Sequence, residues 1–314
     1  MMGPALGSKV DGEFSDDRNV FNRRQLLYHA ILTVRGRHTL KKLLIYCAFL
    51  AGLVALGPSI AQQSAAPGAV PPGAAALGYT RRTIYLTPTT DDISYDDTVK
   101  SLYSGDWYDP VKPPSTYFMT NGVLTMNLGG VLTTESRKSQ PGALPLLLGS
   151  KGFYVEFAVK LSENDNDHFP AVWVMPQEHN SSQSDHQAGD PPHYERWLEL
   201  DVNEGGLGTN QSGAYRGAVI DWWGIYPHYE RKVFNNIVRD PIDMTVEHIF
   251  GASYDPAGQQ VTWWLDGSKM GSQSTASFPA VVNSYHYYLI MNAATRGAKL
   301  PYQMQVRYLA AWTP

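Results

Sequence analysis

Residues 197–204 read Trp-Leu-Glu-Leu-Asp-Val-Asn-Glu, a stretch in which apolar and polar side chains alternate. The apolar residues take every second position, namely Leu198, Leu200 and Val202. This is the period of a β-strand with one face in a core. The opposite face carries Trp197, Glu199 and Asp201. Two carboxylates beside a tryptophan on one strand face indicate a binding site rather than an ordinary solvated surface.

Glu204, the third acid of this stretch, is out of phase with Glu199, and plain alternation would turn it into the core. A one-residue bulge around Val202 and Asn203 would restore the phase, and bulges recur beside active sites because they re-aim a side chain. With the bulge, about 13 Å separates the Cα atoms of the two glutamates, at about 3.3 Å per strand residue. Their side chains can then converge to roughly the 5 to 5.5 Å between carboxyl groups in a retaining glycosidase.

A pair of carboxylates at that separation can cleave a glycosidic bond. One carboxylate is ionised and attacks the anomeric carbon, while the other is protonated and assists the leaving oxygen. Asp201 lies between the two glutamates on the same face, where it can hydrogen-bond to either and raise the pKa of a neighbour. The alternative is a set of three solvated acids on an exposed strand, and this stretch alone leaves both interpretations open.

The composition is that of a globular β protein. Of 314 residues, 43% are hydrophobic, 17% are charged and 12% are aromatic, with 8 Trp and 19 Tyr. β-Branched and aromatic residues favour strands, and the many flat side chains are suited to stacking.

The amino-terminal part has the features of an export signal. Residues 43–56 form the first strongly apolar run; basic residues precede it and small residues follow it. This order is typical of a secretory signal peptide within an extension of residues 1–61, with cleavage after Ala61. We therefore expect a periplasmic or secreted protein. The alternative is an uncleaved membrane anchor formed by residues 43–60.

The charge and the cysteine count exclude several classes of function. Cys47 is the one cysteine of the chain and lies inside the apolar run, so the mature protein would have no disulfide, thiol nucleophile or cysteine metal site. Beyond residue 61 there are 17 basic and 25 acidic residues, a net charge of −8. An acidic exported domain does not favour nucleic acid as a partner. We expect a monomer that requires no cofactor and contacts no membrane beyond the export segment.

The organisation of the remaining chain follows from its turn and strand signals. Residues 62–78 are rich in Pro, Ala and Gly and carry no charge, which predicts an unpacked linker. Residues 79–314 form one predicted all-β domain, a sandwich or jelly roll. Asn121-Gly122 predicts a hairpin between two of its strands. The predicted strands are 82–86, 117–120, 123–128, 152–161, 171–175, the acidic strand itself, 217–223, 247–254, 260–265, 287–292 and 302–311.

A long polar loop, residues 177–193, contains side chains of the metal-ligand type: His179, Asp185, His186, Asp190 and His193. No pair among them has a recognised ligand spacing. The Ser, Gln and Pro content of the segment favours a solvated loop, so we predict no metal site there.

Tryptophans are the candidate sugar platforms, because sugar rings have apolar faces. Trp197 is the first candidate, since its phase matches that of Glu199 and Asp201. Trp173 and one of the adjacent pair Trp222 and Trp223 come next, with core packing as the alternative for each.

The motif Glu199-Leu200-Asp201-Val202-Asn203-Glu204 resembles the Glu-x-Asp-x-x-Glu signature of glycoside hydrolase family 16, in the bulged form of laminarinases, agarases and carrageenases. Four further segments resemble family strands in the same order along the chain. They are 152–157 (GFYVEF), 169–176 (FPAVWVMP), 248–267 (ending in Asp-Gly) and 288–292 (YLIMN, which brings in Asn292 as a substrate-binding candidate).

The resemblance implies a concanavalin-like β-jelly roll that performs retaining hydrolysis of internal β-linkages. By position, Glu199 would be the nucleophile, Asp201 the assisting carboxylate and Glu204 the general acid/base. The implied substrate is a polysaccharide, either a β-1,3- or β-1,3/1,4-glucan or a bacterial exopolysaccharide. Some relatives carry a structural calcium ion, for which this sequence indicates no ligands.

Two departures from the family pattern bear on the substrate: Phe169 stands where tryptophan is usual, and the loop at 205–213 is unusually rich in glycine. Three alternatives to a hydrolase remain open from the sequence. They are a transglycosylase, a non-catalytic carbohydrate-binding protein on the same fold, and a structural domain anchored to the cell envelope.

Overall fold

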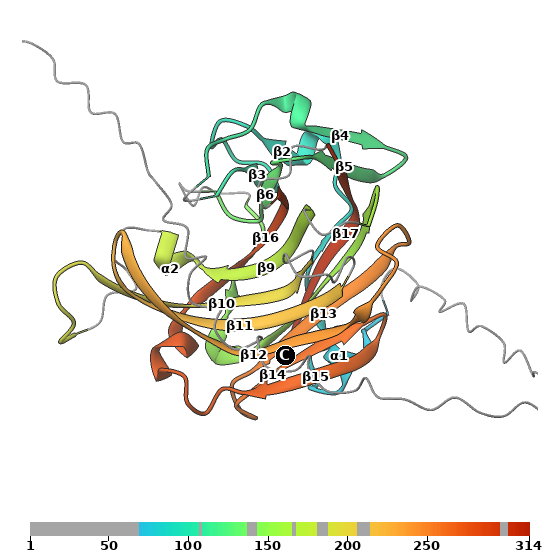
Figure 1. Cartoon of the computed structure of the whole chain (residues 1–314). Coiled ribbons are helices and arrows are strands. Elements are labelled where there is room, and N and C mark those ends of the chain that lie inside the picture. The colour runs from blue at the N-terminus through green and yellow to red at the C-terminus, as the bar shows by residue number, and fades with distance from the viewer. Residues whose placement is uncertain are drawn as a thin grey trace, which may run out of the picture. The chain divides into compact units, whose positions relative to one another are not determined.

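Two β-sheets pack against each other in the computed structural model of the chain (Figure 1). The structure describes residues 69–314 except for 107–108, 137–142, 165–167, 181–187, 206–213 and 296–300. All described residues belong to one unit, Ile60–Pro314. Two of the predictions, the export segment and the 205–213 loop beyond its first residue, lie outside the described residues.

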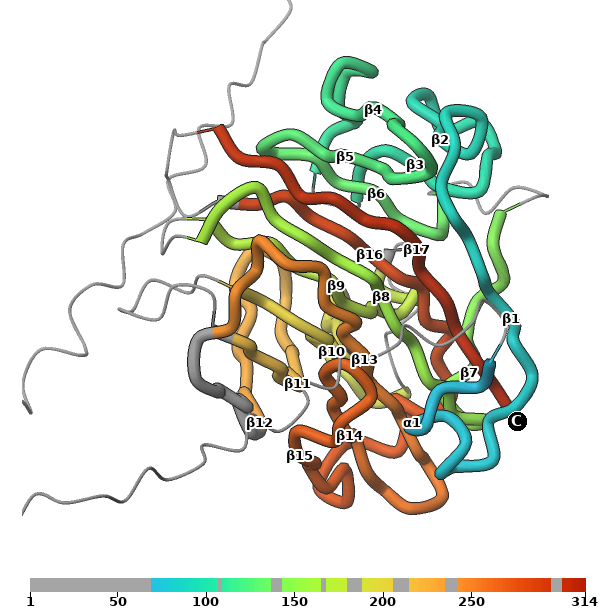
Figure 2. Tube along the Cα trace, turned by 90° about the vertical axis from the view of Figure 1, so that its right-hand side faces the viewer, coloured from blue at the N-terminus to red at the C-terminus, as the bar shows by residue number. Residues whose placement is uncertain are grey.

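Sheet A contains eight strands among the described residues. They are β1 (Arg81–Leu86), β4 (Tyr117–Thr120), β5 (Val123–Asn127), β8 (Phe153–Leu161), β13 (His248–Asp255), β14 (Gln260–Leu265), β15 (Ser268–Ser274) and β17 (Gln303–Thr313). The main order is β15-β14-β13-β8-β17-β5-β4, and β1 pairs with β17. Figure 2 shows β1 running beside β17, so the first and last described strands are neighbours.

Sheet B contains nine strands in the described part of the chain. They are β2 (Ile93–Ser94), β3 (Leu102–Ser104), β6 (Val131–Thr133), β7 (Leu147–Leu148), β9 (His168–Pro176), β10 (Tyr194–Glu204), β11 (Ala214–Ile225), β12 (His228–Pro241) and β16 (His286–Thr295). The main order is β12-β11-β10-β9-β16-β6-β3-β2, with β7 against β16. The acidic stretch is therefore in β10, well inside its sheet.

Helical structure is sparse in the described residues. There are two four-residue helices, α1 (Pro72–Ala75) and α2 (Gln177–Asn180). The short 3-10 turns are η1 (Thr90–Asp92), η2 (Pro114–Thr116), η3 (Gly149–Lys151) and η4 (Ala280–Ser284). None of the helices in the described part of the chain is long and apolar enough to cross a membrane.

The predicted all-β jelly-roll sandwich is confirmed, and every predicted strand is present within a few residues of its expected ends. The Asn121-Gly122 turn joins β4 to β5, with φ of 53° and 73° at its two residues. Both values lie in the left-handed region that asparagine and glycine tolerate best. The pattern did not predict β12, β15 or the two- and three-residue strands of sheet B.

The core lies between the sheets and is built from alternate residues of each strand. Phe157 on β8, Leu200 on β10 and Leu289 on β16 are among its fully buried members. Burying a side chain of this size stabilises the fold by roughly 1.5–3 kcal/mol. Because Leu198, Leu200 and Val202 all point into this core, the intervening residues of β10 point to the opposite face of sheet B.

The linker prediction for residues 62–78 is wrong over its described part. Helix α1 packs on the outer face of sheet A, where Ala74 is fully buried in a cluster with Tyr154 and Trp312. A Cβ atom on Gly73 would lie 2.5 Å from the Tyr154 ring and 2.7 Å from the Trp264 ring, so only glycine allows this close approach. Small residues here permit packing on an aromatic surface, whereas the same composition predicted an unpacked linker.

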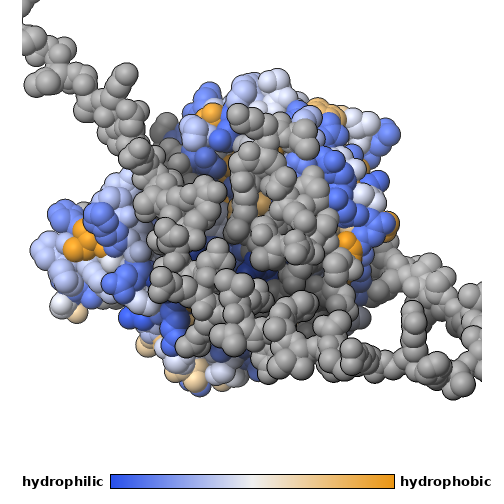
Figure 3. Space-filling model, viewed as in Figure 1, coloured by the Kyte–Doolittle hydropathy of each residue, from blue (hydrophilic) through white to orange (hydrophobic). Residues whose placement is uncertain are grey.

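Large exposed apolar side chains are scattered over the described surface. In Figure 3 the apolar residues form small separate patches among hydrophilic ones. Tyr226, in the turn between β11 and β12, is the most exposed of them. Single exposed apolar residues of this kind are normal on a protein surface.

Candidate active site

The bulge predicted in β10 is present. Against β9, Asp201 pairs with Trp173 and Asn203 pairs with Val172, so Val202 is the extra residue. The register then resumes with Glu204 opposite Ala171. The extra residue shifts the phase by one position, and Glu204 therefore returns to the face that carries Glu199 and Asp201. We call this face of sheet B the acid face.

Backbone groups that the bulge removes from the strand ladder find partners elsewhere. Trp263, on β14 of the opposite sheet, donates from Nε1 to the Asp201 carbonyl oxygen at 2.8 Å. The Asn203 side chain accepts the backbone N–H of Arg216 at 3.1 Å. A Cβ atom on Gly217 would lie 2.4 Å from the Trp263 ring, so glycine makes room for this indole. These contacts fix the bulge from the core side, because a buried carbonyl without a donor is costly.

The Glu199 carboxylate is partly buried and has two hydrogen-bond donors. Trp222 Nε1 lies 2.8 Å from its Oε2, and Asp201 provides a second side-chain hydrogen bond. Desolvation, followed by the negative charge of Glu204, raises the pKa of Glu199 to about 7. The two hydrogen bonds and the charge of Arg231 act in the opposite direction. Both donors favour the ionised carboxylate, the form that a nucleophile requires.

Asp201 as a residue is only 2% exposed. Its pKa lies well above the ordinary value, first because of desolvation and then because of the charges of Glu199 and Glu204. Its Oδ2 receives no hydrogen bond from the protein in the described structure. A protonated Asp201 can donate to Glu199, so the middle carboxyl of the motif stabilises the ionised form of its neighbour.

Four planar side chains lie in a row across the acid face, beside Glu199. Trp197 pairs with Trp222, which pairs with Arg231, so β10, β11 and β12 place these three side by side. The two indoles are parallel within 6°, with centroids 5.7 Å apart, and the Arg231 guanidinium lies 5.1 Å from the Trp222 centroid. His179 of α2 stacks on Trp197 at 3.5 Å. We call these four residues the planar row.

The planar row changes the interpretation of two predicted sugar platforms. Trp197 is on the acid face as expected, but it is only 4% exposed because His179 covers it and Tyr229 meets it edge-on. It is therefore a packed support and not an open platform. Trp223, the other member of the pair of which one was expected on this face, lies on the opposite face of β11, near Arg196. Of the adjacent pair, Trp222 alone reaches the carboxylates.

Trp173 and Asn292 also lie on the acid face and contact each other. Trp173 pairs with Asp201 on one side and with Ile290 of β16 on the other. Its Nε1 donates to Asn292 Oδ1 at 2.6 Å. Trp173 as a residue is only 6% exposed, so it forms a wall beside Asp201 and offers little surface to stack on.

Sequence reasoning missed His179 as a packing partner and did not consider Glu195, Tyr229 or Arg231. Tyr229 donates a short hydrogen bond to Glu195 at the end of the planar row. Arg231 is on β12, which the pattern did not predict as a strand. The phase of Glu195, two residues before Trp197, was the one available signal, since it places this glutamate on the acid face.

The described residues contain no group of three or more His, Cys, Asp or Glu side chains arranged to hold a metal ion. Of the loop residues weighed as ligands, Asp185 and His186 lie outside the described residues. His179 stacks on Trp197.

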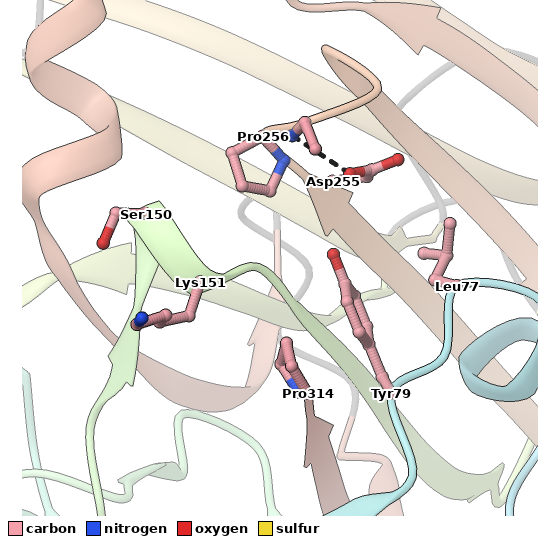
Figure 4. Close-up of a pocket in the computed structure, with 8 residues that line it drawn as sticks. Leu77, Tyr79, Ser150, Lys151, Asp255, Pro256 and Pro314 are labelled. Atoms are coloured by element: carbon pink, nitrogen blue, oxygen red, sulfur yellow. Dashed lines mark hydrogen bonds between the residues drawn. The ribbon is translucent and has the colours of Figure 1, made fainter.

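The structure also contains a cavity of about 450 Å³ near the described amino-terminal segment. Figure 4 shows Tyr79, Lys151 and Asp255 around it, with Leu77, Ser150, Pro256 and Pro314. None of its lining residues belongs to β10, β11 or β12, so this cavity is separate from the carboxylate cluster.

Comparison with models of protein families and with curated proteins finds no match. Solved structures do match. The κ-carrageenase of Pseudoalteromonas carrageenovora, in complex with an oligotetrasaccharide of κ-carrageenan, is 14% identical, with a TM-score of 0.46 over 64% of this chain and 83% of that one. LamAcat of Zobellia galactanivorans is 11% identical, with a TM-score of 0.48 over 75% and 98%. The endo-β-1,3-glucanase of Pyrococcus furiosus is 18% identical, with a TM-score of 0.42 over 63% and 78%. Similarity at this level assigns no activity, so the role of each residue depends on the geometry of this chain.

Proposed function

We propose that this protein is a retaining endo-β-glycosidase of the glycoside hydrolase family 16 type that cleaves internal linkages of a polysaccharide. The observation that supports it best is the environment of the Glu199 carboxylate. Glu199 accepts hydrogen bonds from Trp222 and Asp201, which favour its ionised form, and Glu204 is close enough for its charge to raise the pKa of Glu199. Two interacting carboxylates, one of which receives hydrogen bonds that favour its ionised form, are what a double displacement needs.

The proposed reaction has two steps. The Glu199 carboxylate attacks the anomeric carbon while Glu204, as general acid, gives its proton to the departing glycosidic oxygen. Glu204 then takes a proton from water, which attacks the same carbon and releases Glu199. Asp201 keeps its proton and holds Glu199 in position through both steps. No metal ion or organic cofactor takes part.

The proposed substrate is a β-1,3- or β-1,3/1,4-glucan or a bacterial exopolysaccharide, which the resemblance of the motif supports. We further propose that the protein is exported as a monomer. Cleavage after Ala61 would release it, and retention of residues 43–60 would leave it on the membrane. The mass of the mature amino terminus distinguishes the two.

Release of reducing sugar by the purified protein tests the proposal. The panel contains β-1,3-glucan, mixed-linkage glucan, galactans and the host's own exopolysaccharide, with Glu199→Gln in parallel. Release by the wild type and not by the variant supports a glycosidase that uses Glu199. Binding without release would favour a carbohydrate-binding protein, and products longer than the donor at high acceptor concentration would favour a transglycosylase.

A further inference from the structure

The planar row leaves little of Trp222 available for stacking on a sugar. Strand β11 lies between β10 and β12, so Trp197 and Arg231 approach the Trp222 ring from opposite sides. The edge of the indole is in use as well, because Nε1 donates to Glu199. Arg231 forms the exposed end of the row, whereas Trp222 is half-buried, so Arg231 is the member of the row most open to a sugar beside Glu199.

Arg231 is exposed, and none of the described residues uses its hydrogen-bonding capacity. Its guanidinium stacks on Trp222, and no ion pair or hydrogen bond links it to any described residue. It remains unpaired although its charge acts on Glu199. A guanidinium held flat against an indole keeps the N–H groups along its edge free and already oriented.

We propose that Arg231 binds an anionic substituent, a sulfate ester or a carboxylate, on the sugar unit next to Glu199. This inference rests on the proposed function and adds the charge of the substrate. The planar fork matches either anion in a bidentate manner. Val233 follows two residues later on the same face and is 44% exposed, which gives the sugar ring an apolar surface beside the cation.

The charge of the surrounding groups makes this position the suitable one for an anion. On the acid face the charges of Glu199 and Glu204 act on Asp201, and these carboxylates would repel an anionic group placed among them, with Arg216 as the cation that acts on Asp201. On the β12 side of Glu199 the near charged group is Arg231, while Glu230 and Lys232 point to the opposite face. A neutral sugar hydroxyl would form hydrogen bonds there that are weaker than those between a guanidinium and an anion.

Equilibrium binding tests the inference without requiring turnover. The titrations use the full chain with Glu204→Gln, so that substrate is not consumed, and matched polysaccharides with and without charge: laminarin against sulfated laminarin, and desulfated against native κ-carrageenan. The measured quantity is the ratio of affinities for the charged and the uncharged member of each pair. We expect the charged member of at least one pair to bind more tightly, and less so as salt rises.

Three variants of the same protein sharpen the test. Arg231→Gln should lower this ratio about tenfold to a hundredfold, the range expected for losing a hydrogen bond to a charged group. Arg231→Lys should retain part of the ratio, because it keeps the charge and loses the fork. Lys232→Gln removes a neighbouring cation on the other face of β12 and should leave the ratio unchanged.

The outcomes separate this inference from the proposed function. A ratio that Arg231→Gln does not change, or tighter binding of the uncharged member in every pair, would overturn the inference. If the wild type releases reducing sugar from none of the polysaccharides, the proposed function is contradicted, whatever the affinity ratio.

Discussion

Both faces of this sandwich that point away from the core carry a buried carboxylate, but the surroundings of the two differ. On the outer face of sheet A, Glu156 accepts hydrogen bonds from Tyr308 at 2.9 Å and from Tyr154 at 3.2 Å, under the cover of α1. On the acid face of sheet B, Glu199 and Asp201 lie with Glu204, and the charges of these carboxylates raise the pKa of Glu199 and Asp201.

The comparison shows that burial and a raised pKa do not by themselves identify a catalytic acid. Desolvation raises the pKa of Glu156 just as it does for Glu199. The Glu156 carboxylate has a hydroxyl donor for each oxygen and no second carboxylate among the groups that shift its pKa. The acid face has three interacting carboxylates, so protonation of one changes the pKa of the others, and one can act as an acid while another acts as a nucleophile. Coupling distinguishes the two regions, and each variant below tests that difference.

The largest effect is expected from removing one member of the coupled pair. Glu199→Gln keeps the shape of the side chain and removes the nucleophile, so kcat should fall by roughly 10³-fold or more. Glu156→Gln is the matched change in the other region and should leave kcat close to that of the wild type. Steady-state assays on the polysaccharide that the panel identifies measure both. Equal losses in the two variants would contradict the distinction.

The next effect concerns the pH dependence of the nucleophile. Because the pKa of Glu199 is about 7, kcat/KM of the wild type should fall as the pH drops below about 7. Trp222→Phe removes a donor that stabilises the ionised form, so it should raise this pKa and lower kcat/KM about tenfold to a hundredfold. Trp223→Phe changes the neighbouring indole on the opposite face and should leave the pH at which kcat/KM falls unchanged. If the pH at which kcat/KM falls is the same in Trp222→Phe as in the wild type, this hydrogen bond does not set the pKa of Glu199.

A smaller effect on activity is expected at the bulge. Trp263→Phe leaves the Asp201 carbonyl without its donor from sheet A, which should lower the free energy of unfolding by about 1–3 kcal/mol. It should also lower kcat, because Glu204 depends on the bulge for its direction. Urea denaturation and kinetics on the same preparation measure the two effects. Lost stability with unchanged kcat would show that the bulge holds without this contact.

The smallest effect on activity is expected from Tyr308→Phe, which should cost about 1–3 kcal/mol of unfolding free energy and leave kcat unchanged. Glu156 has a raised pKa in the folded state, so stability falls as pH rises from the ordinary glutamate pKa through the raised one. Losing the Tyr308 hydroxyl raises this pKa further and makes the fall larger. Urea denaturation at about pH 5 and about pH 8 compares the two conditions. A smaller fall in the variant would contradict this account of Glu156.

The sequence was informative wherever the side chains alternate in type along a strand. The alternation of β8 and β10, the turn at Asn121-Gly122 and the bulge at Val202 were all predicted, because each depends on local period or turn chemistry. Strand β12 was missed because charged residues lie on both of its faces, as is usual for the edge strand of a sheet.

The composition of the planar row depends on tertiary structure. Which of Trp222 and Trp223 reaches Glu199 depends on the phase of β11, and a single sequence leaves that choice open. The stack of His179 on Trp197 depends on α2 folding back over β10. Arg231 enters the site through its pairing with Trp222, a contact that no local pattern reveals.

The anomeric configuration of the first product tests the central claim most directly. Proton NMR, recorded within minutes of adding the enzyme to the polysaccharide that it cleaves, distinguishes the two anomers before they interconvert. Glu199 as nucleophile and Glu204 as acid/base predict the β-anomer first, because two displacements restore the original configuration. Initial release of the α-anomer would show a single displacement by water and would contradict the assignment of Glu199 as nucleophile.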